Sequence, residues 1–318
     1  MSVLKNRINK KKKANKQTGF GTNASNYGGR FINKDGSANV KKIGIPILER
    51  ISWYHTMLNI SGIKFMCIIF VFYLLVNFVF ASLYCLIGVE HLNGIEPSAF
   101  VQNFGQAFFF SAQTFTTVGY GHISPVGFWA SFVASIEALF GLLTFAIATG
   151  LFYGRFSKPK AHIKFSENAV IAPFQGGKAL MFRMTPYKNT NLTEAEAKVN
   201  LGMIVEENGI EINRFFSLDL EYDKINALTL SWTIVHPITE DSPLYGFTEA
   251  DFKKNNGEVI VFVKAFDEMF SNTVAISSSY MFSEIVYGAK FSQMFDDEDD
   301  TITVLDLSKL NTYHKVEL

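Results

Sequence analysis

The chain of 318 residues has only 2 cysteines and 8 prolines, and both cysteines lie in one apolar run. Along a helix Cys67 and Cys85 are about 27 Å apart, which is too far for a bridge, so no secreted disulfide framework exists. The six histidines show no metal-ligand spacing, and no G-x-G-x-x-G motif is present. We therefore expect neither an enzyme nor a nucleotide-binding regulatory domain, and we expect no cofactor and no nucleic-acid partner.

Charge of one sign is missing from parts of the chain, although 29 Lys/Arg balance 29 Asp/Glu overall. Residues 1–50 hold 12 basic against 2 acidic residues, whereas residues 161–318 hold 13 against 24. Residues 88–127 contain no lysine or arginine at all. The two ends of the chain therefore experience different electrostatic surroundings, or meet each other.

Two long apolar runs are present instead. Phe65 to Val89 reaches about 37 Å as a helix, enough to cross a bilayer of about 30 Å, and Phe128 to Tyr153 is of similar length. The second run carries one charge, Glu137, which we expect to face protein or water rather than lipid. Basic residues lie before the first run and after the second, so both termini are predicted to be cytoplasmic and the loop between the runs to face outward.

A shorter apolar segment, Asn103 to Thr116, lies in that loop. It is too short to span a membrane, so we expect a helix, with Asn103 as its N-cap, that enters the membrane and returns. "TVGYG", Thr117 to Gly121, follows directly. Non-helical backbone at membrane depth is tolerated only where protein or a water-filled path surrounds it, which favours an ion pathway over a structural loop.

The chemistry of this pentapeptide follows from its glycines. Gly119 and Gly121 allow backbone angles that other residues avoid, so successive carbonyls of an extended strand can point one way. Four copies around an axis would then form rings of oxygens that replace the hydration shell of a potassium ion, bound at Thr117, Val118, Gly119 and Tyr120. Since one chain supplies one loop, we expect a homotetramer. A receptor or binding module with a membrane anchor, the competing class, needs neither feature.

The flanking regions complete the predicted organisation. Residues 1–42 are basic and polar and are expected to be disordered. Residues 43–62 contain an amphipathic stretch, Pro46 to Ile60, predicted to lie at the cytoplasmic membrane face, with a buried soluble helix as the alternative. Residues 63–157 would form the pore and residues 158–318 a cytoplasmic immunoglobulin-like β-sandwich, because short β-branched runs alternate there with turn residues. Within that domain Leu192–Glu206 fits helix or strand.

Together these segments resemble the inward-rectifier potassium channels, especially the bacterial branch. Three stretches carry the resemblance, which covers about Ile43 to Leu310: "AFFFSAQTFTTVGYGHISP", "LFYGRFSKPK" with "HIKFSENAVIAPF" after it, and "LSWTIVHPITEDSPLYG". The resemblance implies a tetrameric two-span channel in a prokaryotic inner membrane, with the cytoplasmic sandwiches continuing the pore. A two-span potassium channel gated by a small ligand on the β domain is the alternative.

The resemblance also implies roles for single residues. Gly141 matches a glycine at which the inner helix bends, or else it serves close helix packing. Tyr153 matches an aromatic constriction at the helix-bundle crossing, with Phe156 as its rival, or is an interfacial tyrosine. The basic junction is implied to meet anionic phospholipid headgroups, or simply marks topology; its members are Arg155, Lys158, Lys160 and Lys64.

At three positions the sequence departs from the pattern of this family, and each departure bears on the expected function. Eukaryotic relatives pair an acid in the pore helix with an arginine after the filter, but the matching residues here are Gln113 and Ile123. We therefore expect neutral hydrogen bonds to support the filter. Phe145 occupies the cavity position at which strong rectifiers carry an acid, so strong intrinsic rectification is not expected.

Overall fold

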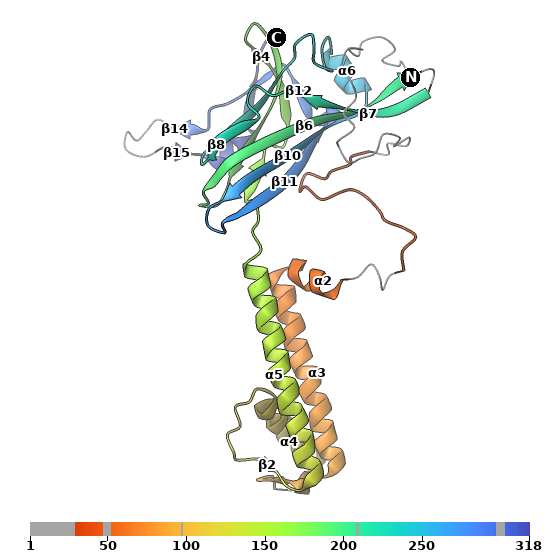
Figure 1. Cartoon of the computed structure of the whole chain (residues 1–318), viewed down its shortest axis with the longest axis vertical. Coiled ribbons are helices and arrows are strands. Elements are labelled where there is room, and N and C mark those ends of the chain that lie inside the picture. The colour runs from red at the N-terminus through yellow and green to blue at the C-terminus, as the bar shows by residue number, and fades with distance from the viewer. Residues whose placement is uncertain (1–28, 47–51, 97, 208–209, 297–302) are drawn as a thin grey trace. The chain divides into compact units, whose positions relative to one another are not determined.

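The structure is a computed structural model, and it describes residues 29–46, 52–96, 98–207, 210–296 and 303–318. The described residues form two compact units, one comprising Ile43–Lys158 and the other combining residues 29–42 with Pro159–Leu318. Helices make up the first unit and strands most of the second (Figure 1). The chain passes between the units twice, once before and once after the helices.

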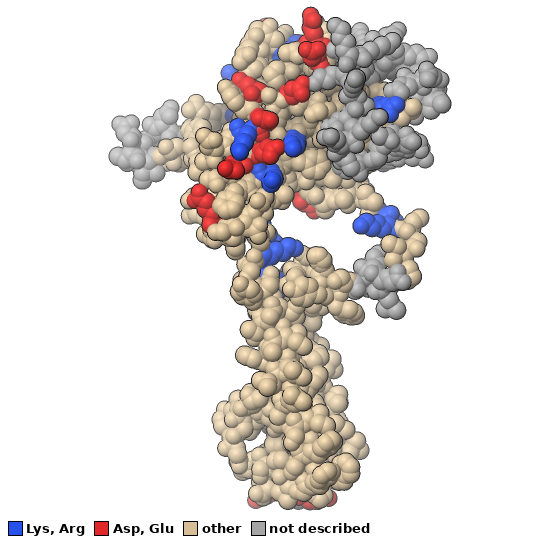
Figure 2. Space-filling view, viewed as in Figure 1, with Lys and Arg blue, Asp and Glu red and all other residues tan. Residues whose placement is uncertain are grey.

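Two long helices, α3 (Gly62–Ile87) and α5 (Phe128–Phe156), dominate the first unit. With 26 and 29 residues they are long and apolar enough to cross a membrane, as the sequence predicted. Their side chains face mostly outward, and Figure 2 shows this unit almost free of charge along its length. Ser61 caps α3 by accepting a hydrogen bond from the Lys64 amide, and Arg155 lies in the last turn of α5, where a cation is favourable.

The loop between these helices contains η1 (Val89–His91), β1 (Leu92–Asn93), α4 (Phe100–Phe115) and β2 (Ser124–Pro125). β1 and β2 pair antiparallel and so bring the two ends of the loop together. The expected re-entrant helix is α4, but it begins before the predicted N-cap. Asn103 lies inside the helix, and its side chain exchanges hydrogen bonds of 2.9 and 3.0 Å with the backbone of Ser98.

A short helix, α2 (Trp53–Asn59), precedes α3 and is shorter than the amphipathic helix predicted from Pro46 to Ile60. Ser52 begins it, because its hydroxyl accepts a hydrogen bond from the His55 amide. Residues 47–51 of the predicted helix lie outside the described residues. None of the α2 residues is buried, which argues against the alternative of a buried soluble helix.

The second unit is a sandwich of two five-stranded sheets. In the first sheet the order is β11-β10-β6-β7, with β8 also on β6; in the second it is β12-β4-β5-β3, with β9 also on β5. Only β12 and β4 pair in parallel among these strands. The strands are β3 (Ile163–Phe165), β4 (Ala169–Phe174), β5 (Gly177–Pro186), β6 (Leu192–Glu207), β7 (Ile210–Leu218), β8 (Lys224–Leu228), β9 (Trp232–Pro237), β10 (Gly257–Asp267), β11 (Asn272–Met281) and β12 (Ile285–Tyr287).

Smaller elements close the sandwich. They are α6 (Glu249–Lys254), η2 (Phe282–Glu284), β13 (Ala289–Phe291), β14 (Phe295–Asp296), β15 (Val304–Leu305), η3 (Leu307–Asn311) and β16 (Tyr313–Lys315). The apolar faces of the two sheets meet in one large core that includes Phe182, Leu201 and Val261. The acidic run from Asp296 to Asp300 begins at β14, and its remainder lies outside the described residues.

The segment that fitted helix or strand is a strand, β6. A β-bulge explains the ambiguity: Lys264 pairs with Glu196 but Phe266 pairs with Thr193, so two residues of β6 oppose one of β10. At the bulge Glu194 takes a left-handed φ of 49°. The buried positions therefore switch from even to odd numbers within the strand, which breaks the two-residue period that marks strands.

Residues 30–39 of the N-terminal tail pack on the sandwich, and the prediction of a disordered tail is wrong for these residues. The amides of Phe31 and Ile32 donate to the buried carboxylate of Glu258, over 2.7 and 3.0 Å. Ile32 is itself buried against Phe215 and Ile260. Residues 1–28 lie outside the described residues.

Candidate functional site

The Thr117–Gly121 segment has the backbone that an ion-binding strand needs. Thr117, Gly119 and Gly121 have positive φ angles of 60°, 55° and 79°, whereas Val118 and Tyr120 between them do not. Such an alternation of handedness turns successive carbonyls to the same side of the chain. Val118 is 54% exposed and Tyr120 79%, so a single chain leaves this strand uncovered.

Backbone hydrogen bonds connect the Thr117–Gly121 strand to the last turn of α4. The carbonyl of Gln113 accepts hydrogen bonds from the amides of Val118 and Gly119, over 2.9 and 3.3 Å, and the Thr114 carbonyl accepts one from Thr117. These are hydrogen bonds between backbone groups; the expectation that neutral hydrogen bonds replace an ion pair between positions 113 and 123 stays a prediction. Ile123, at the other end of the strand, packs on the apolar cluster beneath the loop. The position of the strand therefore depends on the position of α4.

A cavity of 340 Å³ lies beside Thr116 and Thr117, between the C-terminal end of α4 and inner parts of α3 and α5. Thr117 and Phe145 both line it, so the structure brings the first filter residue and the predicted cavity residue together. Further along α5, Tyr153 and Phe156 are each 75% exposed in the single chain, whereas Phe152 packs edge-on against Phe65. Both predicted gate residues thus lie where a neighbouring copy could meet them.

A buried polar cluster joins the three helices behind the strand. The hydroxyl of Tyr84 on α3 donates to Glu137 Oε2 over 2.6 Å, and the Ser111 hydroxyl of α4 lies within hydrogen-bond reach of Glu137 Oε1. Asn77 on α3 lies 3.0 Å from that hydroxyl through its Oδ1. Glu137 is fully buried and faces the pore helix, as expected.

Asn77, Tyr84 and Ser111 were not identified from the sequence. A signal was present, because Asn77 and Tyr84 are seven residues apart in an apolar run and so occupy one face of a helix. Ser111 carries no such signal, since a serine in an apolar helix also bonds to its own backbone. Only the packing of the three helices makes it a partner of Glu137.

Gly141 lies one turn beyond Glu137 on α5, and the structure shows a close packing contact there, while the bend stays a prediction. A Cβ at this position would overlap the carbonyl group of Phe115, the last residue of α4. The helix continues unbroken through Gly141 to Phe156. The inner helix can therefore approach α4 this closely only because residue 141 has no side chain.

The basic junction is built around Arg155. Its guanidinium donates to the carbonyls of Met57 and Ile60, over 2.5 and 2.8 Å, and lies 4.5 Å from the centre of the Phe65 ring. These carbonyls belong to the C-terminal end of α2, where a cation is favourable. Arg155 thus clamps α2 to α5, a role the sequence did not predict.

The other three predicted lipid-contacting residues are exposed lysines. Lys158 donates from Nζ to the Asn59 side chain over 2.6 Å and so also contacts α2. Lys64 lies in the first turn of α3, and Lys160 belongs to the second unit, two residues beyond Lys158 in the chain. Their charges are accessible to an anionic surface.

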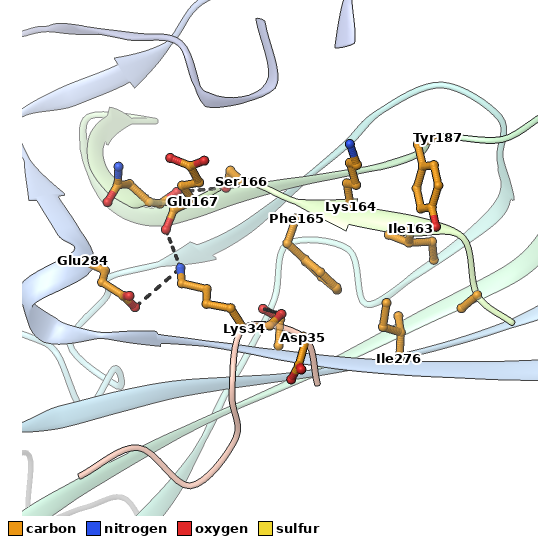
Figure 3. A pocket seen from close by; sticks show the side chains of 13 residues that line it. Lys34, Asp35, Ile163, Lys164, Phe165, Ser166, Glu167, Tyr187, Ile276 and Glu284 are labelled. Carbon is orange, nitrogen blue, oxygen red and sulfur yellow. Dashed lines mark hydrogen bonds and ion pairs between the residues drawn. The ribbon is translucent and has the colours of Figure 1, made fainter. Parts of the chain in front are cut away.

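The sandwich unit contains a cavity of 640 Å³ (Figure 3). Under the alternative of a channel gated by a small ligand on the β domain, this cavity is a candidate binding site. Lys34 reaches into it and approaches Glu284 at 3.5 Å, donates to the Glu167 carbonyl, and lies 4.2 Å from the centre of the Tyr280 ring. Burial lowers the pKa of Lys34, while the Glu284 carboxylate opposes that shift. Because the Lys34 cation already has partners, it offers less to an anionic ligand than an unpaired lysine would; Lys164 also lines the cavity.

Comparison with known proteins gives consistent matches along the chain. Residues 163–318 match the family model "Inward rectifier potassium channel C-terminal domain", and residues 66–158 match the model "Ion channel". The inward rectifier potassium channel Kirbac3.1 of Paramagnetospirillum magnetotacticum is 34% identical over 289 residues, which are 89% of this chain and 95% of that protein. The ATP-sensitive inward rectifier potassium channel 12 of Gallus gallus is 27% identical over 86% of this chain and 69% of its own length.

Among solved structures, the sporulation control protein Spo0M of Bacillus subtilis matches 42% of this chain and 59% of its own. The identity is 10% and the TM-score 0.21, which is too low to bear on the fold.

Replacing Arg155 by alanine should release α2 from the inner helix. Hydrogen bonds to a charged group stabilise by about 1.5–3 kcal/mol, so amide exchange in Trp53–Ile60 should accelerate about 10- to 100-fold. Hydrogen–deuterium exchange of the reconstituted protein measures this. Lys158→Ala, which removes one exposed contact, serves as the control and should change exchange less than about fivefold. Equal exchange in both variants would show that Arg155 does not hold the helix.

Proposed function

The chain belongs to the inward rectifier potassium channel family, of the bacterial type, and we propose that it forms a homotetramer through which potassium ions cross the membrane passively. It is an integral membrane potassium channel and not an enzyme. One observation carries the proposed pathway: a strand of alternating backbone handedness, Thr117–Gly121, hangs from a half-helix between two spans. Potassium ions would bind at the carbonyls of Thr117 to Tyr120 in rings of four.

We place both termini on the cytoplasmic side of a prokaryotic inner membrane. The basic residues before α3 and after α5, with none between residues 88 and 127, support this orientation. Phe145 would line the central cavity below the filter. Because a phenylalanine there offers no negative charge to polyamines or magnesium, intrinsic rectification is expected to be weak.

The proposed gate is Tyr153, near the cytoplasmic end of α5. Its ring is 75% exposed in the single chain, and four such rings around an axis would exclude water and stop ions by dewetting. Phe156 lies about one turn nearer the cytoplasm and has the same exposure, so it is the rival constriction. Anionic lipid would act at the basic junction close by, through Lys64, Lys158, Lys160 and the α2 helix that Arg155 holds.

Selective flux is the test of the function itself. In liposomes containing the purified protein, potassium and rubidium should permeate while sodium is largely excluded, because the filter carbonyls replace the hydration shell of the larger ions only. Competition of unlabelled potassium or sodium against rubidium-86 uptake measures this. Equal competition by the two ions would rule out a potassium-selective channel.

Opening the constriction should raise resting flux without changing selectivity. We expect Tyr153→Ala to increase rubidium uptake, because a smaller side chain leaves the path wetted. The potassium-to-sodium preference should stay as in the wild type, since it is set at Thr117–Gly121. Phe156→Ala is the matched comparison in the same lipid. If Phe156→Ala alone raises uptake, the constriction lies one turn further towards the cytoplasm.

Anionic lipid should control flux through the lysines. The resemblance to bacterial members implies that phosphatidylinositol bisphosphate inhibits. Each basic residue near such a surface contributes about 1 kcal/mol, so Lys158→Ala/Lys160→Ala should raise the lipid fraction needed for half-inhibition up to about 30-fold. Lys224→Ala, an exposed lysine on β8, is the control. Flux that ignores the anionic lipid content in both wild type and double variant would contradict the proposal.

A further inference from the structure

The inner helix touches the pore helix at two points one turn apart. Glu137 on α5 contacts the Ser111 hydroxyl of α4, and Gly141 on α5 receives the carbonyl of Phe115. Glu137 and Gly141 are four residues apart on α5, and Ser111 and Phe115 are four residues apart on α4. Each helix therefore presents its two contacting residues on one face. The contact between Glu137 and Ser111 is polar, and the contact at Gly141 leaves no room for a side chain. Two contacts at this spacing define both the rotation and the height of α4 against α5.

The outer helix completes the polar contact. Tyr84 donates to the second oxygen of Glu137 over 2.6 Å, and Asn77 Oδ1 lies 3.0 Å from the Ser111 hydroxyl. The Asn77 amide is oriented, because its Nδ2 donates to the Tyr73 carbonyl over 2.7 Å. All four side chains of this cluster (Asn77, Tyr84, Ser111, Glu137) are at most 1% exposed. Such a buried network is costly to disturb, since any partner left alone has no water to replace it.

A shift of α4 would reach the filter directly. Ser111 lies two residues before Gln113, whose carbonyl accepts from the amides of Val118 and Gly119. The contact at Phe115 is closer still, two residues before Thr117. We propose that Glu137 and Gly141 are positioning residues that hold α4 in register against the inner helix and thereby set the geometry, and so the selectivity, of the Thr117–Gly121 strand. This inference rests on the proposed potassium pore.

Substitutions at residue 137 can distinguish the effect of its hydrogen bonds from the effect of its charge. The Ser111 hydroxyl has one proton and lies between two acceptors, Glu137 Oε1 and Asn77 Oδ1. A glutamine at 137 could accept from Tyr84 and donate to Ser111, which leaves the Ser111 proton for Asn77. Glu137→Gln should therefore keep α4 in place, whereas Glu137→Leu, of similar size, removes every polar contact of this residue.

A substitution at residue 141 can distinguish a packing contact from a hinge at this position. If Gly141 is a hinge, Gly141→Ala changes the opening of the channel and leaves selectivity as it was. If it is a contact, the added methyl displaces α4 and changes selectivity. Gly150→Ala is the matched control on the same helix, because a Cβ at Gly150 has no neighbour within 4 Å among the described residues.

The experiment compares Glu137→Leu, Glu137→Gln, Ser111→Ala and Gly141→Ala in the full chain, after gel filtration has shown the same assembly as the wild type. Ser135→Ala is the control for Ser111→Ala, because among the described residues the exposed Ser135 hydroxyl bonds only to the Ser131 carbonyl of its own helix. Two properties are measured: the preference of rubidium uptake for potassium over sodium as competitor, and hydrogen–deuterium exchange of residues 111–121.

We expect Glu137→Leu and Gly141→Ala to lower the potassium preference at least about fivefold and to accelerate exchange of the Val118 and Gly119 amides by a similar factor. Ser111→Ala should shift both in the same direction, while Glu137→Gln, Gly150→Ala and Ser135→Ala stay near the wild type. Wild-type preference and exchange in Glu137→Leu and Gly141→Ala would overturn the proposal, as would a Glu137→Gln variant that fails as Glu137→Leu does. If the wild type itself lacks potassium-selective uptake, the proposed function fails, and amide exchange still decides the positioning role.

Discussion

The interior of a membrane offers no hydrogen-bond partner to a peptide group, and the helical unit is organised around this constraint. α3 and α5 satisfy their own backbone, whereas residues 117–121 leave helical geometry and depend on neighbouring protein. Their support is the last turn of α4, through the Gln113 carbonyl. α4 is in turn held by the inner helix, at a buried carboxylate and at a glycine that allows close approach. A chain of contacts therefore leads from Glu137 to the strand that would select the ion.

At the C-terminal end of α5 a second chain of contacts links the inner helix to α2. Arg155 binds two carbonyls at the end of α2 and lies over the Phe65 ring, which belongs to the outer helix. Tyr153 and Phe156 flank Arg155 in the sequence, so a movement of the proposed gate must carry α2 with it or break these bonds. A lipid headgroup that pulls on Lys158 would act on the same helix, because this lysine also contacts Asn59. The arginine thus couples α2, α3 and α5 at this end of the helical unit.

The N-terminal segment shows how far composition can mislead about order. Residues 29–42 look polar and glycine-rich, yet Ile32 is buried and two successive amides bind the buried Glu258 carboxylate. Order here comes from the partner surface on β10 and β11 rather than from the segment itself. β6 illustrates the same limit, since its bulge at Glu194 depends on pairing with β10 and breaks the alternation that would identify a strand.

The sequence by itself determined the features that follow from the length of apolar segments, the period of hydrophobic residues and local residue chemistry. Two apolar runs specify two spans, and the glycines of Thr117–Gly121 specify a backbone conformation that few other residues can adopt. Patterns of this kind also sufficed for the sandwich and for the family. What the tertiary structure decided is which side chains meet across helices. Tyr84 and Ser111 become hydrogen-bond partners of Glu137, and Asn77 becomes a partner of Ser111. Gly141 becomes a contact and Arg155 a clamp, because residues from 26 to 98 positions apart are brought to hydrogen-bond distance only by packing.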